Sequence, residues 1–216
     1  MAEKVRCVII CGSPDTNAEF IKSFVKDTDY VICADSGYKT ALSAGIEPDL
    51  FVGDFDSYSG EVKNSVEIVK LNTHKDDSDS MHCANLAFDR GFTDVALVGA
   101  SGGRLDHTLA NLYVLRYLSE KGVKASLESD KETVQFLTPG EYNYKNKGKT
   151  FSVFPFACDK TVVSYEGDVE YTASSLCLNS SQVVGLSNIF LGDNVKVRII
   201  SGNALIIVNK VSNSNI

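Results

Sequence analysis

PDLFVGDFDSYSG, residues 48–60, decides how the first half of the chain folds. The apolar run Leu50, Phe51 and Val52 predicts a short buried strand. The run ends at Gly53, and the carboxylates of Asp54 and Asp56 follow with one residue between them. Acidic residues are poor strand formers and costly to bury, so this pair is expected at the mouth of the strand, where it needs a specific partner.

Similar apolar runs recur along the first part of the chain and alternate with segments of helical periodicity. Strands are predicted at residues 6–12, 30–35, 50–54, 67–71, 94–100, 125–129 and 133–137, and helices at 16–27, 38–44, 81–88 and 105–122. Strands that are apolar throughout and separated by helices predict a mostly parallel sheet covered on both faces. We therefore expect an α/β fold, with a Rossmann-like domain over residues 1–138.

Beyond residue 138 the helical periodicity disappears. Short strand-like runs, among them TFSVFPFA, KTVVSYEG and NVKVRII, are separated by Gly, Asn, Asp and Ser. This pattern predicts a second domain over residues 139–216, built as an all-β sandwich.

Composition narrows the function. The 216 residues are 44% hydrophobic and 23% charged, with a net charge of −7. A nucleic-acid or anionic-membrane partner is not expected, because such proteins usually present a basic face. No apolar run is long enough to span a bilayer and the first residues lack a signal-peptide layout, so a cytoplasmic protein is expected. The six cysteines form no C-x-x-C pair and are expected as free thiols.

The pair Asp54 and Asp56 suggests a metal. In an extended segment, residues two apart project to the same side. Two adjacent carboxylates repel unless a cation joins them, and Mg²⁺ binds through such carboxylates together with phosphates. For the pair taken alone, a solvated turn, with Asp56 or Ser57 capping a helix, is the favoured explanation.

A second acidic run, Lys75-Asp76-Asp77-Ser78-Asp79, opens the next predicted helix. Asp and Ser are common in a first helical turn, where they cap amides. Three carboxylates exceed what a cap needs, however, and Asp76 and Asp79 share a helix face. Lys75 is placed to pair with them or to reach a phosphate.

The third element is GASGGRLDH, residues 99–107. Glycines between a strand and a helix let amides approach an anion, which assigns that role to Gly102 and Gly103. Arg104 adds a bidentate phosphate ligand, and Asp106 and His107 follow. In a parallel sheet these loops meet beyond the carboxyl ends of the strands, joined by Asp35 in CADSG. The convergence favours Mg²⁺–nucleotide phosphate chemistry.

Five motifs in order resemble the thiamin pyrophosphokinase family: CADSG, PDLFVGDFDS, KDDSDS, GGRLDHTLANL and, at residues 185–188, GLSN. The resemblance implies an α/β domain and a β-sandwich domain assembled as a homodimer. It also implies an enzyme that uses ATP and Mg²⁺ to transfer pyrophosphate to the hydroxyl of thiamin, giving thiamin diphosphate and AMP.

The same resemblance assigns residues to the reaction by position. The metal and phosphate centre would comprise Asp54, Asp56, Asp76 and Asp79, completed by Asp106, with Arg104, Gly102 and Gly103 on the polyphosphate. The remaining nucleotide-site residues would be Asp35, Ser36, Ser57, Lys75 and His107. Thiamin would lie at the dimer interface against the second domain, in contact with Ser187 and Asn188. Members of the family often stack an aromatic side chain, sometimes Trp, on thiamin. This chain has no Trp, and its nearest match is Tyr171, which follows Gly167.

Two other functions compete with this interpretation. DFDS after a strand is similar to the nucleophile motif of haloacid-dehalogenase-like phosphatases, in which Asp54 would attack phosphorus. The downstream lysine and terminal acidic pair of that pattern are not evident in the sequence. The other rival is a non-catalytic protein that binds a nucleotide in the same cleft.

Overall fold

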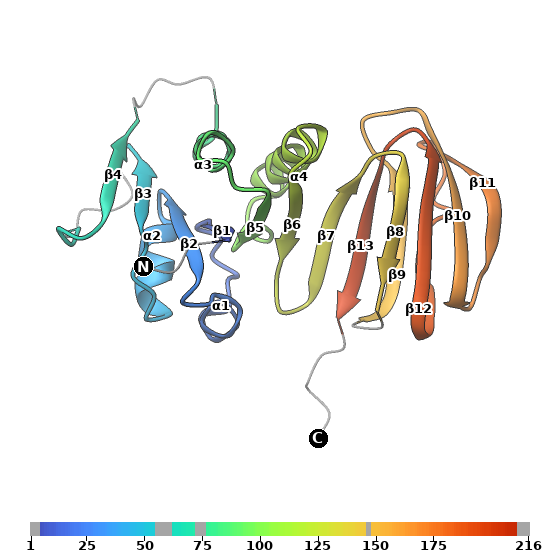
Figure 1. Cartoon of the computed structure of the whole chain (residues 1–216), viewed down its shortest axis with the longest axis horizontal. Coiled ribbons are helices and arrows are strands. Elements are labelled where there is room, and N and C mark those ends of the chain that lie inside the picture. Colours follow the sequence, from blue (N-terminus) through green and yellow to red (C-terminus); the bar gives the residue numbers. More distant parts are fainter. Residues whose placement is uncertain (1–4, 55–61, 72–76, 146–147, 211–216) are drawn as a thin grey trace. The chain divides into compact units, whose positions relative to one another are not determined.

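The computed structural model describes residues 5–54, 62–71, 77–145 and 148–210 (Figure 1). These residues form four helices and thirteen strands, and they divide into two compact units, 1–129 and 130–216. The helices are α1 (Ala18–Phe24), α2 (Gly37–Ser43), α3 (Asp79–Asp89) and α4 (Leu105–Glu120). The strands of the first unit are β1 (Arg6–Ile10), β2 (Asp29–Ala34), β3 (Leu50–Gly53), β4 (Glu67–Lys70), β5 (Asp94–Val98) and β6 (Lys124–Glu128).

The first unit is built on a parallel sheet with the strand order β6-β5-β1-β2-β3-β4. Every neighbouring pair in this order is parallel. The central strand β1 pairs on one side with β2, placing Cys7 opposite Tyr30, and on the other with β5, placing Cys7 opposite Val95. The carboxyl ends of all six strands therefore lie at the same edge of the sheet, as the apolar runs predicted.

The helices of the first unit cover the apolar side chains of this sheet. A buried cluster joins Val8 and Ile10 of β1 to Ile21 of α1 and Tyr38 of α2. Tyr38 stacks on Phe51 of β3 with the ring centroids 4.7 Å apart. The other two helices, α3 and α4, contact each other; α3 also contacts β1, β2 and β3, and α4 contacts β6. The core thus fixes the strand ends that carry the acidic loops.

The second unit consists of strands alone among its described residues: β7 (Glu132–Leu137), β8 (Gly140–Tyr144), β9 (Gly148–Pro155), β10 (Lys160–Val169), β11 (Ala173–Asn179), β12 (Asn188–Ser201) and β13 (Ala204–Lys210). Antiparallel pairs join β7 to β13 and β13 to β9, and a second set joins β11, β10, β12 and β8. The long strand β12 contacts both sets, since Asn188 and Ile189 pair with β9.

The division between the units falls after Ser129, earlier than the boundary expected at residue 138. The reason is β7, which pairs with β13 over its whole length, from Leu137 opposite Ala204 to Glu132 opposite Asn209. Local periodicity suggests a strand at this place but not its partner. At the level of class, the prediction of a mixed α/β protein rich in strands is confirmed.

All six cysteines are free, and Cys7, Cys11, Cys33 and Cys83 are buried. The helices described in the structure are too short or too polar for any of them to cross a bilayer.

We expect Phe51→Ala to lower the free energy of unfolding by about 3–5 kcal/mol, because it removes a fully buried ring and leaves a cavity against Tyr38. Urea unfolding followed by circular dichroism measures the change. Leu42→Ala, at a side chain that is 38% exposed, is the control and should lose about 1 kcal/mol or less. Equal losses in the two variants would contradict the packing described for β3.

Candidate functional site

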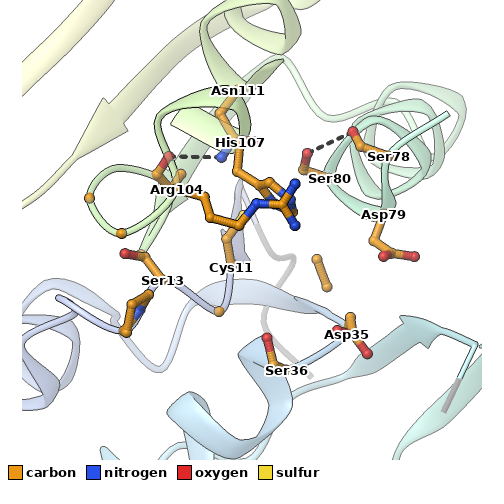
Figure 2. A pocket seen from close by; sticks show the side chains of 17 residues that line it. Cys11, Ser13, Asp35, Ser36, Ser78, Asp79, Ser80, Arg104, His107 and Asn111 are labelled. Carbon is orange, nitrogen blue, oxygen red and sulfur yellow. Dashed lines mark hydrogen bonds between the residues drawn. The ribbon is translucent and has the colours of Figure 1, made fainter. Parts of the chain in front are cut away.

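A cavity of ≈ 460 Å³ opens at the carboxyl ends of the parallel strands (Figure 2). Its wall comes from the loops that follow β1, β2 and β5, the start of α3 and one face of α4. The lining residues are Cys11, Gly12, Ser13, Pro14, Ala34, Asp35, Ser36, Ser78, Asp79, Ser80, Gly99, Ala100, Gly102, Gly103, Arg104, His107 and Asn111. Of the loops expected to converge, the loops after β2 and β5 and the start of α3 line this cavity, whereas Asp54, which follows β3, is not among its lining residues.

The position of this cavity follows from the strand order. After β1 the chain proceeds to β2, β3 and β4 on one side, and β5 and β6 lie on the other side of β1. At such a reversal neighbouring loops leave the sheet in different directions, and a crevice opens beyond the strand ends. The loops after β1 and β5 both line the cavity, so it lies at this switch point.

Asp35 and Asp54 follow the neighbouring strands β2 and β3. The amide of Asp35 donates to the carbonyl of Val52 at 2.8 Å, and its φ of 46° is unusual for a residue other than glycine. A Cβ at Gly53 would lie 3.2 Å from the Cα of Asp35, so glycine permits the close approach of the two strand ends. Asp54 is the next residue and is half-buried.

Asp79 is the first residue of α3. The cap of this helix is Ser78, whose hydroxyl accepts from the amide of Met81 at 3.3 Å. The capping explanation offered for the acidic run therefore applies to Ser78, while Asp79 lines the cavity. Figure 2 shows Asp79 and Asp35 on the same side of the cavity, with Arg104 extending toward them from the glycine-rich loop.

Arg104 and Asp106 bind each other. Arg104 Nη2 lies 2.6 Å from Asp106 Oδ2, and Nε lies 3.1 Å from Oδ1. The hydrogen bond from Arg104 is the main reason that the pKa of Asp106 is lowered, so this carboxyl stays charged. Both side chains are exposed, and Asp106 also accepts from the amide of His107 at 2.9 Å. Arg104 and His107 line the cavity, and Asp106 lies beside it as the partner of Arg104.

The glycine-rich loop differs from the expectation in one respect. The amide of Gly103, which the sequence assigns to a phosphate, donates to Asp15 Oδ2 at 2.7 Å. Sequence reasoning did not select Asp15, because an acid in the short segment Ser13–Thr16 resembles an ordinary turn.

Other lining residues were also missed. Asn111 is buried on α4 and donates from Nδ2 to the carbonyl of Ala100 at 2.7 Å, which ties the helix to the loop after β5. The hydroxyls of Ser78 and Ser80 lie 3.0 Å apart. Two signals in the sequence could have found Asn111: it lies within the motif GGRLDHTLANL, and its spacing of four residues from His107 places both on the same helix face.

Asp35 and Asp79 in the cavity wall, and Asp54 after the neighbouring strand β3, fit a hard divalent cation in their chemistry, because they offer only oxygen ligands. Within the described ranges, however, no group of three acidic, histidine or cysteine side chains is arranged to hold a metal ion by itself. Mg²⁺ typically takes one or two carboxylates and completes its shell with water and phosphate oxygens. Asp56, Ser57, Lys75 and Asp76, also predicted for the site, lie outside the described residues.

Cys11 is the thiol that lines the cavity. Burial, with a smaller contribution from Asp79, raises its pKa to about 12. The thiol is therefore neutral at physiological pH and does not supply a thiolate nucleophile.

In the second unit, the three residues predicted to contact thiamin lie together. Asn188 is buried, and its Oδ1 accepts from the amide of Tyr171 at 3.0 Å while its Nδ2 donates to the carbonyl of Tyr171 at 2.8 Å. The Tyr171 side chain is 63% exposed. Ser187 is exposed, has a φ of 61°, and donates its amide to Ser152 Oγ at 3.0 Å. Asn188 thus holds the backbone that carries Tyr171.

Comparisons with known proteins agree on one family. The family profile described as thiamin pyrophosphokinase, catalytic domain, matches residues 21–127, which is most of the first unit. Thiamine pyrophosphokinase of Bacillus subtilis (strain 168) is 28% identical over 158 residues, covering 70% of this chain and 74% of the relative.

Solved structures agree as well. The crystal structure of thiamine pyrophosphokinase from Bacillus subtilis superposes with a TM-score of 0.85 at 22% identity, covering 95% of this chain and 99% of the other. A probable thiamine pyrophosphokinase from Staphylococcus saprophyticus gives a TM-score of 0.74 at 25% identity, covering 96% and 100%. The family profile, the curated relative and these solved structures therefore all make this chain similar to the thiamin pyrophosphokinases.

Proposed function

We propose that this protein is a thiamin diphosphokinase in which the cavity of the first unit binds ATP. The enzyme converts thiamin and ATP into thiamin diphosphate and AMP. One observation carries the assignment to this cavity: the segment that matches the family's catalytic domain contains nearly every loop of the cavity wall.

Each charged group then has a role in positioning the phosphates. Arg104 binds them through its planar fork. Asp35, Asp54 and Asp79, with Asp56 and Asp76 of the neighbouring segments, hold Mg²⁺, which neutralises phosphate charge when bound. The hydroxyl oxygen of thiamin bonds to the β-phosphorus and its proton is released to solvent, while the bond from that phosphorus to the α–β bridging oxygen breaks and AMP leaves. Much of the rate gain comes from holding these two atoms together.

We also propose roles for the other residues that the sequence predicts for the site. Ser36, Ser57, Lys75, Gly102 and His107 complete the nucleotide site. Asp106 completes the catalytic set, and it pairs with the guanidinium of Arg104 until the phosphates bind. In the second unit, Ser187 and Tyr171 contact thiamin, and Asn188 supports Tyr171 through the two hydrogen bonds to its backbone.

We also propose the finer architecture and assembly. The parallel order of the first unit supports a Rossmann-like domain, and the two antiparallel strand sets around one core support a β-sandwich. A homodimer is supported by exposed apolar side chains that are close in sequence, because such patches usually mark interfaces. They are Val183, Val184, Leu186, Ile189 and Leu191, with Tyr171 nearby. Six free cysteines support a cytoplasmic location.

The rival functions are not favoured. A phosphatase would release inorganic phosphate, and a binding protein would hold nucleotide without turnover. The family match supports neither, since the profile and the relatives are thiamin pyrophosphokinases.

The first test is product analysis with ATP, Mg²⁺ and thiamin. AMP and thiamin diphosphate should form in equal amounts, and removing Mg²⁺ with a chelator should stop the reaction. Asp54→Asn and Asp79→Asn should each lower kcat/KM by about 100-fold or more, because each removes a charge that holds the metal and phosphates.

Asp89→Asn is the control for this test, because Asp89 is an exposed acid at the other end of α3. It should retain wild-type activity. Full activity in the Asp54 or Asp79 variant, with the folded state verified by circular dichroism, would remove that residue from the mechanism.

The second test concerns Ser187. Ser187→Ala should raise the KM for thiamin about three- to tenfold, the value of one hydrogen bond, and leave the KM for ATP unchanged. Ser187→Gly should do the same although glycine suits the positive φ, which separates the hydroxyl from backbone strain.

Ser175 offers a matched control for Ser187. It is also exposed, has a φ of 53°, and donates its amide to a serine hydroxyl at 3.0 Å. Ser175→Ala should leave both KM values unchanged. The thiamin contact is refuted by an unaltered thiamin KM in the two Ser187 variants.

A further inference from the structure

We propose that Asp15 is a positioning residue that clamps the loops after β1 and β5 together and thereby fixes Arg104 over the cavity. Neither the sequence motifs nor the family match, which begins at residue 21, points to this residue. The proposal rests on the proposed function in that it takes the nucleotide phosphates as the ligand of Arg104.

Two hydrogen bonds join these loops across the switch point. The amide of Ser13 donates to the carbonyl of Gly99 at 3.0 Å, and in the reverse direction the amide of Gly103 donates to Asp15 Oδ2 at 2.7 Å. Thr16 closes the first loop, with its hydroxyl donating to the carbonyl of Ser13 at 2.6 Å. The Gly103 bond is the one that ends on an ionised group, and such bonds are stronger than neutral ones.

The packing between the loops supports the same role. A Cβ at Gly102 would lie 2.6 Å from Asp15 Oδ2, and a Cβ at Gly103 would lie 2.7 Å from the Cδ of Pro14. Both glycines also have positive φ values, 88° and 62°. The two glycines are therefore required by the close approach of Pro14 and Asp15, which the sequence pattern alone does not distinguish from the approach of a phosphate.

The consequence for Arg104 follows from chain order. Arg104 comes directly after Gly103 and is the N-cap of α4, where its side chain makes no capping hydrogen bond. Glycine has the widest choice of backbone conformations, so two in succession would leave Arg104 poorly oriented. Asp15 removes that freedom by holding the Gly103 amide. The phosphates then meet the guanidinium of Arg104, since this amide is already bonded.

An opposite role for Asp15 makes an opposite prediction. If its carboxylate occupied the place that a phosphate takes on the loop, removing it would strengthen nucleotide binding. If Asp15 is a clamp, removing it weakens binding. Asp15→Asn restores part of the binding, because the Asn side-chain oxygen still accepts from Gly103 without the charge.

The experiment compares Asp15→Ala with Asp15→Asn in the full-length chain. Glu19→Ala, an exposed acid on the adjacent α1, controls for charge. The readouts are kcat, the separate KM values for ATP and thiamin, the calorimetric Kd of a Mg²⁺ complex of a non-hydrolysable ATP analogue, and amide hydrogen exchange over residues 99–107. Asp15→Ser, whose hydroxyl is too short to reach Gly103, is a second loss variant should Asp15→Ala not fold.

We expect Asp15→Ala to raise the KM for ATP and the analogue Kd about tenfold, as for loss of a charge-assisted hydrogen bond that organises the site. The thiamin KM should be unchanged and amides 99–107 should exchange faster. Glu19→Ala should behave as wild type, and Asp15→Asn should lie between wild type and Asp15→Ala, because its neutral oxygen accepts a weaker hydrogen bond. Unchanged or tighter analogue binding in Asp15→Ala, or an Asp15→Asn variant as weak as Asp15→Ala, overturns the proposal.

These arms also separate the two proposals. If the wild-type protein forms no thiamin diphosphate, the proposed function fails, while the analogue Kd and the exchange rates still decide the role of Asp15. If the wild-type activity is as proposed, but the analogue Kd and the exchange rates are the same in the Asp15 variants as in wild type, only the proposal for Asp15 is refuted.

Discussion

The parallel pairing of β1 with both β2 and β5 is the constraint on which the site depends. Because all three strands run in one direction, the residues that follow them reach the same edge of the sheet. Because β2 lies on one side of β1 and β5 lies on its other side, the loops that follow these strands leave a crevice between them. β1 is apolar from Cys7 to Ile10 and fully buried, so this arrangement is held by the core and does not rely on the loops.

The charged side chains at this edge of the sheet come from different strands, helices and loops. Asp35 and Asp54 come from the ends of neighbouring strands and Asp79 from the first turn of α3, whereas Arg104 comes from the loop after β5. Carboxylates gathered in this way repel one another and repel phosphates, and in a chain of net charge −7 a bound cation relieves both. Under the proposed function, an acidic protein can bind a polyanion in this way: the carboxylates would attract a metal ion, and the metal and Arg104 would attract the phosphates.

The sequence predicted what local patterns determine and missed what distant contacts determine. Apolar runs and helical spacing located the parallel sheet and the cavity edge, and the acidic run after β4 located Asp79. The role of Asp15 was not predictable, because its partner Gly103 lies 88 residues away and an acid in a turn is common. The affiliation of β7 was missed for the same reason, since its partner β13 lies near the end of the chain. Asn188 lies beside Ser187 and Tyr171, but it is buried and its amide makes three hydrogen bonds to the backbone, which the sequence pattern did not indicate.

The arginine illustrates how such a site can be ordered before its ligand arrives. Arg104 is held at two points: its backbone follows the Gly103 amide, which Asp15 binds, and its guanidinium pairs with Asp106. The second contact is a fully exposed ion pair, and such pairs contribute little to stability because water screens both charges. Transfer of the guanidinium from Asp106 to a phosphate therefore costs little. The loop clamp is the contact that has to persist when the ligand binds, because it sets the place from which Arg104 reaches the phosphates.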